Sequence, residues 1–280
     1  MKMGFSLQKQ YNEPITRVVS LLSDNGFSSV SPLWTPELDM FSLASSVREN
    51  GMTIQSIHAP YTDIDFLWQS KSERGLSAFE NIKRSIDDCA RFNVPILAIH
   101  GWKGLVYKFP ETPLDFALFD KIVQYAQKRG VSVAFENLEG EEYLDALMSR
   151  YQNLANVGYC WDSGHDNCYP HKTDFLKKFG DRLIMTHLND NFGMRTANGI
   201  PSGDDDLHLI PYDGVIDWDK AIAKLKTAKK QEILNFELKT ISHSIAQEDL
   251  LYANLPLCEF VAKAGERARR IAEKYDDLSN

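Results

Sequence analysis

Histidine and carboxylate residues stand at the ends of a series of short apolar segments. These residues are His58, His100, Glu136, Asp162, His187 and Glu237. Buried carboxylates repel one another or take up protons unless a cation lies between them. Imidazole and carboxylate groups are also common ligands of divalent metal ions. We expect no Lys or Arg side chain to accompany these residues at the segment ends, so ion pairs with basic residues do not account for the set. A metal centre is therefore predicted.

The apolar segments have the length and composition of β-strands, and amphipathic helical patterns follow them. The predicted strands are Met3–Leu7, Ser28–Leu33, Thr53–His58, Ile96–Trp102, Val131–Asn137, Val157–Asp162, Leu183–Asn189 and Ile233–Leu238. A closing helix is predicted from about Gln247. Eight strand–helix units in 280 residues indicate an α/β fold, a (β/α)8 TIM barrel forming a single domain over residues 1–280. An open doubly wound sheet is the alternative, although no glycine-rich nucleotide-binding motif follows any strand.

A barrel would gather the carboxyl ends of its strands at one rim, where barrel enzymes have their active sites. Side chains alternate along a strand, so small residues should share the inward face with the candidate ligands. These small residues are Ser56, Ala98, Ala134 and Cys160. Two connections, Pro60 to Glu73 and Asn191 to Ile216, are long enough to suggest functional loops.

The overall composition restricts the classes of partner. The formal net charge is −8 and the pI is near 5.4, a balance that disfavours polyanions such as nucleic acid. The four cysteines form no CxxC pair, which favours free thiols in a reducing compartment. The N-terminal residues lack a signal-peptide pattern, and no apolar run is long enough to span a membrane. A cytoplasmic location away from membranes is therefore expected.

Several motifs resemble those of the xylose-isomerase-like barrel superfamily, which groups sugar-phosphate isomerases and epimerases with the endonuclease IV abasic-site nucleases. The motifs are "FEN" at 135–137, "DSGH" at 162–165, "HLND" at 187–190, "DLHLIPYDGVIDW" at 206–218 and "FELK" at 236–239. The resemblance extends from the third predicted strand to the eighth. It implies the barrel fold and a bound divalent metal, and it does not by itself select one activity.

Each branch of the superfamily implies its own ligand set. The isomerase and epimerase branch implies one Mn, Mg, Zn or Co ion held by Glu136, Asp162, His187 and Glu237. In that branch Glu136 and Glu237 would also transfer the proton through an enediolate. The endonuclease IV branch implies three zinc ions and the further ligands His58, His100, His165, Asp206 and His208. In an isomerase, His165 and His208 would instead bind substrate oxygens.

The favoured interpretation is a metal-dependent sugar or sugar-phosphate isomerase or epimerase with a small-molecule sugar substrate. The alternatives are an endonuclease IV-like nuclease and a sugar-binding relative without catalysis. The three consecutive aspartates 204–206 argue against DNA binding. An unphosphorylated sugar is favoured because no Lys or Arg cluster is seen at the strand ends. Trp34, Trp68 and Trp102 are candidates to cover the sugar, although packing is the commoner role, and relatives are often homo-oligomers.

Overall fold

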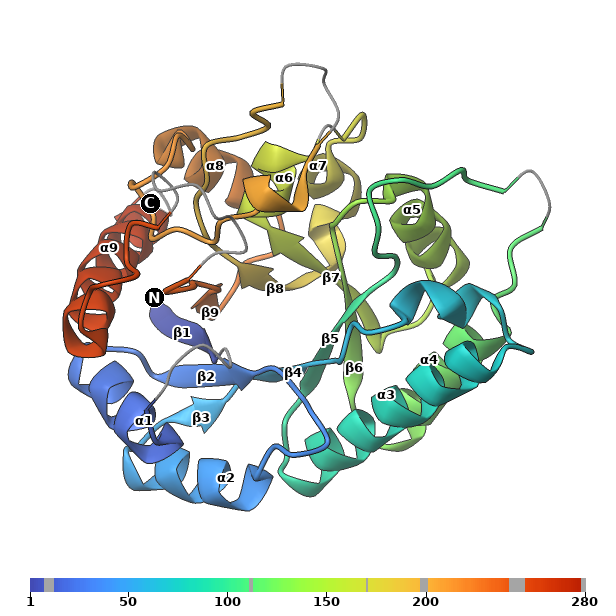
Figure 1. Cartoon of the computed structure of the whole chain (residues 1–280), viewed down its shortest axis with the longest axis horizontal. Helices are drawn as coiled ribbons and strands as arrows, with labels where there is room; N and C mark the ends of the chain where they lie inside the picture. The colour runs from blue at the N-terminus through green and yellow to red at the C-terminus, as the bar shows by residue number, and fades with distance from the viewer. Residues whose placement is uncertain (8–12, 111–112, 170, 197–200, 242–249, 278–280) are drawn as a thin grey trace.

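The computed structural model describes residues 1–7, 13–110, 113–169, 171–196, 201–241 and 250–277. Strands surround the centre of the molecule and helices form an outer ring (Figure 1). The strands are β1 (Lys2–Leu7), β2 (Ser29–Pro32), β3 (Thr53–Ile54), β4 (Ser56–His58), β5 (Ile96–His100), β6 (Ser132–Glu136), β7 (Val157–Asp162), β8 (Leu183–His187) and β9 (Ile233–Phe236). The principal α-helices are α1 (Ile15–Asp24), α2 (Met40–Glu49), α3 (Glu73–Arg91), α4 (Ala117–Lys128), α5 (Glu141–Arg150), α6 (Ser163–Cys168), α7 (Phe175–Phe179), α8 (Trp218–Leu225) and α9 (Leu257–Asp277). Short 3-10 helices are η1 (Ile64–Trp68), η2 (Gly180–Arg182) and η3 (Gly203–Asp205).

The strands close into a parallel barrel. Hydrogen bonding gives the orders β3-β2-β1-β9 and β4-β5-β6-β7-β8. Parallel bridges from Leu33 to His58 and from Leu188 to Phe236 join the two sheets. The third predicted strand is interrupted at Gln55, so β3 pairs with β2 while β4 pairs with β5. The prediction of a (β/α)8 barrel is confirmed, and the open sheet is excluded.

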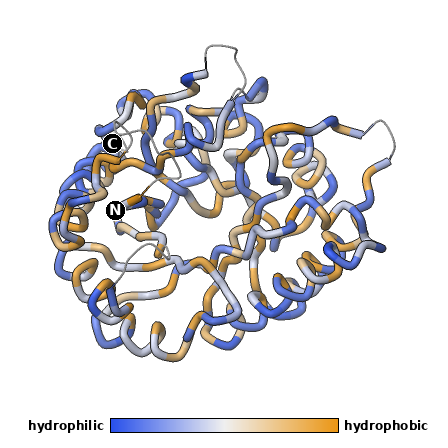
Figure 2. Tube along the Cα trace, viewed as in Figure 1, coloured by the Kyte–Doolittle hydropathy of each residue, from blue (hydrophilic) through white to orange (hydrophobic). Residues whose placement is uncertain are grey.

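The helices bury one face against the strands. In α3, the hydroxyl of Ser72 accepts a hydrogen bond from the backbone N–H of Gly75 and caps the first turn. Ile82 and Ile86, one helical turn apart, are both fully buried. Figure 2 shows the resulting alternation of hydrophobic and hydrophilic stretches along the outer helices. Each helix is therefore fixed by an apolar stripe that packs on the barrel.

The last helix differs from its prediction. Helix α9 begins at Leu257, whereas the sequence suggested a start near Gln247, which lies outside the described residues. The preceding residues 250–256 are turns rather than helix. Within the described ranges, none of the helices combines the length and the apolar character needed to cross a membrane.

The barrel interior has an apolar half and a polar half. Small and sulfur-containing side chains fill the half formed by β5 to β8, in a cluster of Ala98, Ala134, Cys160 and Met185. The other half holds a hydrogen-bonded network of Ser6, Ser31, Ser56 and Asn235. The bulky neighbours Phe135 and Trp161 belong instead to the core between strands and helices. The predicted inward face of small residues is thus confirmed.

Candidate metal centre

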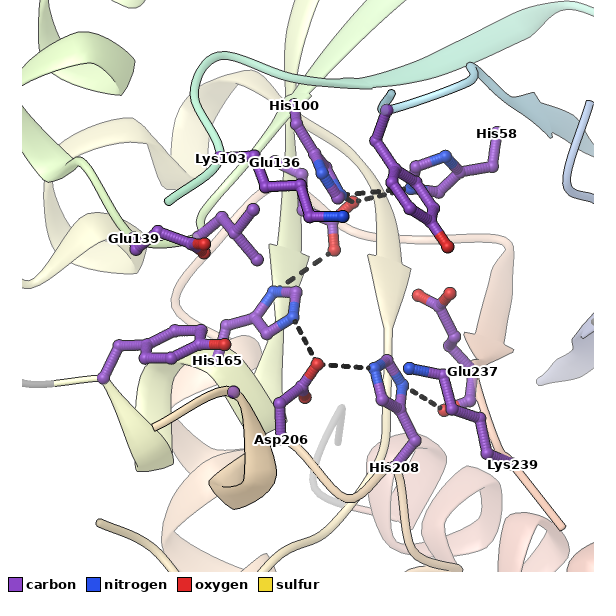
Figure 3. A pocket seen from close by; sticks show the side chains of 14 residues that line it. His58, His100, Lys103, Glu136, Glu139, His165, Asp206, His208, Glu237 and Lys239 are labelled. Carbon is purple, nitrogen blue, oxygen red and sulfur yellow. Dashed lines mark hydrogen bonds and ion pairs between the residues drawn. The ribbon is translucent and has the colours of Figure 1, made fainter. Parts of the chain in front are cut away.

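The predicted site residues gather around one cavity at the carboxyl ends of the strands. The cavity has a volume of about 350 Å³. Seven of the nine predicted residues line it: His58, His100, Glu136, His165, Asp206, His208 and Glu237 (Figure 3). The other two, Asp162 and His187, are fully buried next to Glu136 and Glu237 in the same group of potential ligands. The barrel therefore brings together residues that are up to 179 positions apart, from His58 to Glu237.

One group of four residues forms the centre of this site. The ligand atoms of Glu136, Asp162, His187 and Glu237 all lie within 4.8 Å of one another. His187 Nδ1 is 2.9 Å from Glu136 Oε1 and 2.9 Å from Glu237 Oε2. The four side chains come from the ends of β6, β7 and β8 and from the residue that follows β9. We call this set the four-residue group.

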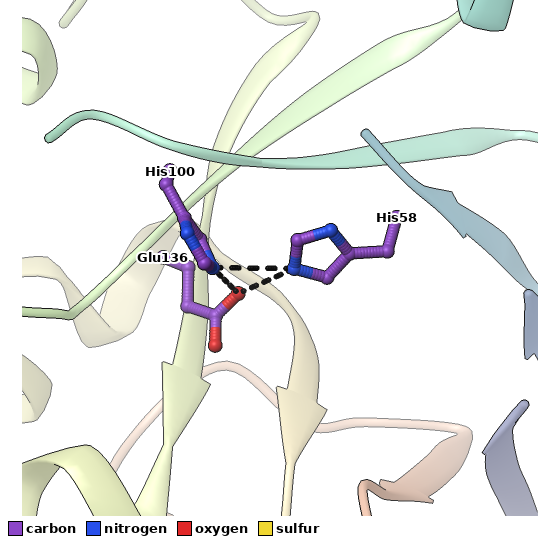
Figure 4. Close-up of side chains that lie close together, drawn as sticks. All are labelled: His58, His100 and Glu136. Atoms are coloured by element: carbon purple, nitrogen blue, oxygen red, sulfur yellow. Dashed lines mark hydrogen bonds and ion pairs between the residues drawn. The ribbon is translucent and has the colours of Figure 1, made fainter. Parts of the chain in front are cut away.

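A second group shares Glu136 and lies on the β4 and β5 side of the cavity. The Nε2 atoms of His58 and His100 are 3.2 Å apart, and they lie 3.4 and 3.3 Å from Glu136 Oε2 (Figure 4). The Nδ1 atom of His58 is 2.7 Å from the backbone carbonyl of Ala59, which orients the ring. Both Nε2 atoms are thus directed at the same carboxylate oxygen.

A third group lies on the opposite side of the cavity. His165 Nε2 and His208 Nε2 are 3.4 and 2.9 Å from the same oxygen, Asp206 Oδ2. His165 Nδ1 faces the backbone carbonyl of Asn137 at 2.8 Å, and His208 Nδ1 faces that of Glu237 at 3.0 Å. In each histidine one ring nitrogen is anchored to the backbone, and the other is available to a ligand.

Buried asparagines hold the carboxylate of Asp162 and the backbone around it. Asn189 Nδ2 donates to both carboxylate oxygens of Asp162, at 3.1 and 2.9 Å. The side-chain oxygen of Asn137 accepts from the backbone N–H of Asp162, and its amide donates to the Asp162 carbonyl. These bonds continue the sheet pairing beyond the end of β6. The orientation of Asp162 is therefore set by side chains that are not themselves candidate ligands.

The long connection after β8 completes the cavity, as expected from its length. Its residue Asp190 forms an antiparallel bridge with Leu209, which returns the chain to the rim. Asp205 is buried and forms an ion pair with Arg195, at 3.2 Å from Nε to Oδ1. The next residue, Asp206, faces the histidines of the third group. Of the three consecutive aspartates, Asp205 thus has a cationic partner and Asp206 faces two imidazoles.

Burial and neighbouring charges perturb the acid–base properties of these groups. Burial raises the pKa of Asp162 to about 6 and lowers the pKa of His100 to about 4. Burial also works to raise the pKa of Glu136, but the neighbouring His187 and His100 outweigh it and hold this pKa well below its usual value. These shifts favour a neutral imidazole at His100 beside an ionised carboxylate at Glu136, which are the forms that bind metals. The pKa values of His165 and His187 are raised instead, because neighbouring acidic groups outweigh the effect of burial.

The arrangement suits a divalent cation. Oε2 of Glu136 is buried and has no hydrogen-bond partner in the described part of the chain, although two imidazole nitrogens point at it. A buried carboxylate oxygen without a donor is costly unless a cation or ligand binds it. Oxygen and imidazole nitrogen donors in this number match Mn, Zn, Mg or Co. The four-residue group offers the most ligand atoms, Cys160 also lies within 4.8 Å of Glu136 and His187, and the two flanking groups could hold further ions.

The cavity also contains residues that the sequence did not single out. They are Tyr61, Lys103, Leu138, Glu139, Tyr169, Gly203 and Lys239. The two lysines contradict the expectation that no basic residue accompanies the strand ends. The position of Lys239 could have been predicted from the alternation of side chains, because it lies two residues after Glu237 and so on the same face. Lys103 and Glu139 are in loops, where no such periodicity applies. Burial raises the pKa of Glu139, whose carboxyl group lies outside these groups of potential ligands.

The three candidate tryptophans have the packing role that the sequence analysis gives as the commoner one, and none of them lines this cavity. Trp34 is buried and donates to Asp88, and Trp68 donates to the carbonyl of Gly101. Trp102 stacks on Tyr143, with ring centroids 4.3 Å apart. Trp34 and Trp68 are buried in the core, and Trp102 is half-buried and packs against it. Among the described residues, the aromatic lining of the cavity comes from Tyr61 and Tyr169 instead.

Comparisons with known proteins agree with this architecture. A family model described as xylose isomerase-like TIM barrel matches residues 19–254. An uncharacterised protein, y4fM, of Sinorhizobium fredii is 29% identical over 93% of this chain and 94% of its own length. Among solved structures, a zinc-bound IOLI protein superposes with a TM-score of 0.77 at 16% identity, covering 98% of this chain and 99% of the other. The D-psicose 3-epimerase of Clostridium cellulolyticum H10, solved with D-tagatose, gives 0.68 at 13% identity, with 97% and 99% covered. At such identities the structural likeness shows the fold alone.

Proposed function

The chain belongs to the xylose isomerase-like TIM barrel family, and from this membership we propose that it is a divalent-metal-dependent isomerase or epimerase of a sugar or sugar phosphate. The observation that carries the proposal is the four-residue group, in which three carboxylates and one imidazole converge within 4.8 Å beside a cavity. A cavity of about 350 Å³ is of the size that holds a small molecule. A D-psicose 3-epimerase among the structural neighbours supports this class of reaction.

The reaction requires removal of a proton from the carbon beside a carbonyl group and its return to the same or the neighbouring carbon. A bound divalent cation would supply Lewis acidity at the oxygens of the substrate. Glu136 and Glu237 are the proposed proton acceptor and donor, since they come from different strand ends, on β6 and directly after β9, and both line the cavity. In this proposal His165 and His208 would orient substrate oxygens, and Tyr61 and Tyr169, which also line the cavity, would reduce access of water.

A proton-exchange assay tests the proposal. Protein reconstituted with Mn, Zn, Mg or Co is incubated with a panel of aldoses, ketoses and their phosphates in D2O. NMR then detects deuterium at the carbon next to the carbonyl, and chromatography detects the product sugar. Glu136→Gln should reduce exchange by about 10²–10⁴-fold, the usual contribution of a general acid–base group. Circular dichroism should show that the variant remains folded.

Glu80→Gln is the matched control, because Glu80 lies on α3 with a side chain that is 60% exposed. It should retain full exchange. Undiminished exchange in Glu136→Gln would contradict the assigned role of Glu136. Saturable binding of a sugar without any exchange would favour a binding protein that lacks catalysis.

The two flanking groups support a second candidate, a nuclease of the endonuclease IV type. Each of them offers three ligand atoms within 4.8 Å, so the chain has residues for three ions. The cavity volume of about 350 Å³ and the net charge of −8 favour a small molecule over a DNA duplex. Metal analysis separates the two: about one ion per chain is expected for the isomerase, whereas three zinc ions and cleavage of a duplex with an abasic site would favour the nuclease.

A further inference from the structure

Two lysines reach into the cavity from different loops. Lys103 follows β5, and Lys239 follows β9. Both line the cavity, and Figure 3 shows both side chains directed toward its interior. Lys239 is only 9% exposed. Lysine is rarely buried to this degree without a partner for its charge.

Neither ammonium group has a carboxylate partner in the ranges that the structure describes. Other half-buried lysines do: Lys224 is 3.0 Å from Asp166, and Lys263 is 2.7 Å from Asp213. The ammonium of Lys103 instead lies 4.1 Å from the centre of the Tyr61 ring. Within 4.0 Å there is no described ion pair for either Lys103 or Lys239. Their positive charge is therefore available to a bound molecule.

The nearby carboxylates already have other partners. Oδ2 of Asp206 is shared by two histidines, and Glu237 Oε2 faces His187. Oε1 of Glu139 accepts a hydrogen bond from the backbone of Gly104. Each of these carboxylates therefore has a contact other than a lysine. Oε2 of Glu139 and Oδ1 of Asp206 have no hydrogen-bond partner among the described residues, and neither forms an ion pair within 4.0 Å with Lys103 or Lys239. An anion from outside would satisfy the lysines without breaking these contacts.

The two lysines also act on each other. Burial lowers the pKa of Lys103, Glu139 opposes this change, and the positive charge of Lys239 adds to it. Two like charges at one cavity are unfavourable until an anion binds close to them. Lysine is a common ligand of phosphate groups, which it binds as a point charge.

We propose that the substrate carries an anionic group, a phosphate or a carboxylate, which Lys103 and Lys239 bind while the carbonyl end faces the four-residue group. This inference rests on the proposed function and narrows its substrate class to acidic sugars. It reverses the preference for an unphosphorylated sugar that followed from the sequence. The lysines select the substrate by its charge, whereas the four-residue group serves the reaction.

Binding measurements test this proposal without any need for turnover. Fructose, fructose 6-phosphate and fructuronate share most of their carbon skeleton, and inorganic phosphate serves as the simplest anion. Isothermal titration calorimetry gives the dissociation constant of each for metal-loaded and chelator-treated protein. At least one anionic sugar should bind about tenfold or more tightly than fructose, as one charge-assisted contact would give. Whether fructose 6-phosphate or fructuronate binds more tightly identifies the anionic group.

Variants assign the preference to the lysines. Lys103→Gln and Lys239→Gln should each weaken binding of the preferred anion about tenfold or more, while fructose binding stays within about twofold. Arg at either position should restore part of the preference. Lys128→Gln is the matched control, because Lys128 is exposed at the end of α4, away from the cavity. It should bind every probe as the unmodified protein does.

The inference is overturned if no anion, inorganic phosphate included, binds more tightly than fructose, or if the lysine variants keep the anion preference. The proposed function can fail separately. Tight, lysine-dependent binding of an anionic sugar without proton exchange would retain the anion site and reject the isomerase. Proton exchange of neutral sugars that is unaffected by Lys103→Gln and Lys239→Gln would retain the isomerase and reject the anion site.

Discussion

Glu136 is the residue at which the contacts of the site meet. Its two carboxylate oxygens lie within 3.4 Å of ring nitrogens from His58, His100, His165 and His187. It therefore belongs both to the four-residue group and to the flanking group on β4 and β5. A change at this position affects two potential ion sites at once, so its effect on metal content should be measured together with its effect on turnover.

Asn137, the next residue, gives a prediction about positioning. Its side chain bonds the backbone N–H and carbonyl of Asp162 and accepts from the hydroxyl of Tyr159, all fully buried. Asn137→Ala would leave these groups without partners and should lower the free energy of unfolding by about 2–4 kcal/mol. Urea denaturation followed by circular dichroism measures the loss. Exposed Asn153 provides the control, and equal stability of the two alanine variants would refute the role given to Asn137.

At the residue scale, the position of strand ends predicted the side chains that the strands supply, whereas the loop residues Asp206 and His208 were found only through the family resemblance, and other loop residues were missed. Glu136 and His187 end buried strands, where position alone indicates the rim. Lys103 and Glu139 have no such marker, because their placement depends on how a loop folds over the barrel. Lys239 could have been inferred from its alternation with Glu237. Whether the nine predicted residues act as ligands or in catalysis stays a prediction.

At the scale of elements, the connection from β8 to α8 contributes most to the cavity after the strands. It supplies Asp206 and His208 to the third group. Its path is held by Asp190, which accepts from the backbone of Tyr212 and Ile216 and from the indole of Trp218. Its length predicted a functional loop. The contacts that order it join residues with no periodic relation, so they could not be read from the sequence.

Arg195 offers a test of this loop. Its guanidinium and backbone N–H both bond to Asp205, which is buried one residue before Asp206. Arg195→Ala would leave a buried carboxylate without its cation and should cost about 1–3 kcal/mol of local stability. Hydrogen exchange of residues 201–216 should accelerate, as measured by mass spectrometry. Turnover should fall in parallel because His208 loses its fixed position.

The matched control is Arg129→Ala, which removes an ion pair to Asp87 in which both side chains are 42% exposed. Such a surface pair contributes little, so exchange in residues 201–216 should not change. If Arg195→Ala also leaves this exchange unchanged, the loop is ordered by Asp190 rather than by the Arg195–Asp205 pair.

On the scale of the whole molecule, the ligand groups connect strands around the barrel. The four-residue group by itself connects the ends of β6, β7, β8 and β9. A cation bound there would stabilise the folded state and not the unfolded chain. At a free metal concentration one hundred times the dissociation constant, the gain would be about 2.7 kcal/mol.

Removal of metal should therefore lower the melting temperature. For a chain of this size the expected decrease is about 5–10 °C, reversed when the metal is restored. Differential scanning calorimetry with and without chelator measures it. Glu237→Gln should show a smaller difference, whereas the surface variant Glu80→Gln should show the full one. Identical melting curves with and without metal would argue against an ion in the four-residue group.

The overall fold was the most predictable feature. Strand–helix alternation with polar residues at the strand ends indicated the barrel, and the structure confirms it. The interruption at Gln55 was not predictable, because the segment Thr53–His58 is uniformly compatible with a strand. Its division depends on two neighbours, β2 and β5, that pair with different parts of it.

The polar half of the barrel interior has a consequence for how the circle of strands closes. Asn235 on β9 meets the hydroxyls of Ser6 on β1 and Ser31 on β2. A slip of β9 by one residue would turn the Asn235 amide outward, so the buried Ser6 hydroxyl would lose its hydrogen bond and the Ser31 hydroxyl would keep only its bond with Ser56. If alanine or valine replaced Ser6, Ser31 and Asn235, no hydrogen bond would be lost in such a slip. The seam between the first and last strands thus admits a single alignment, and that alignment sets the height at which Glu237 and Lys239 enter the cavity.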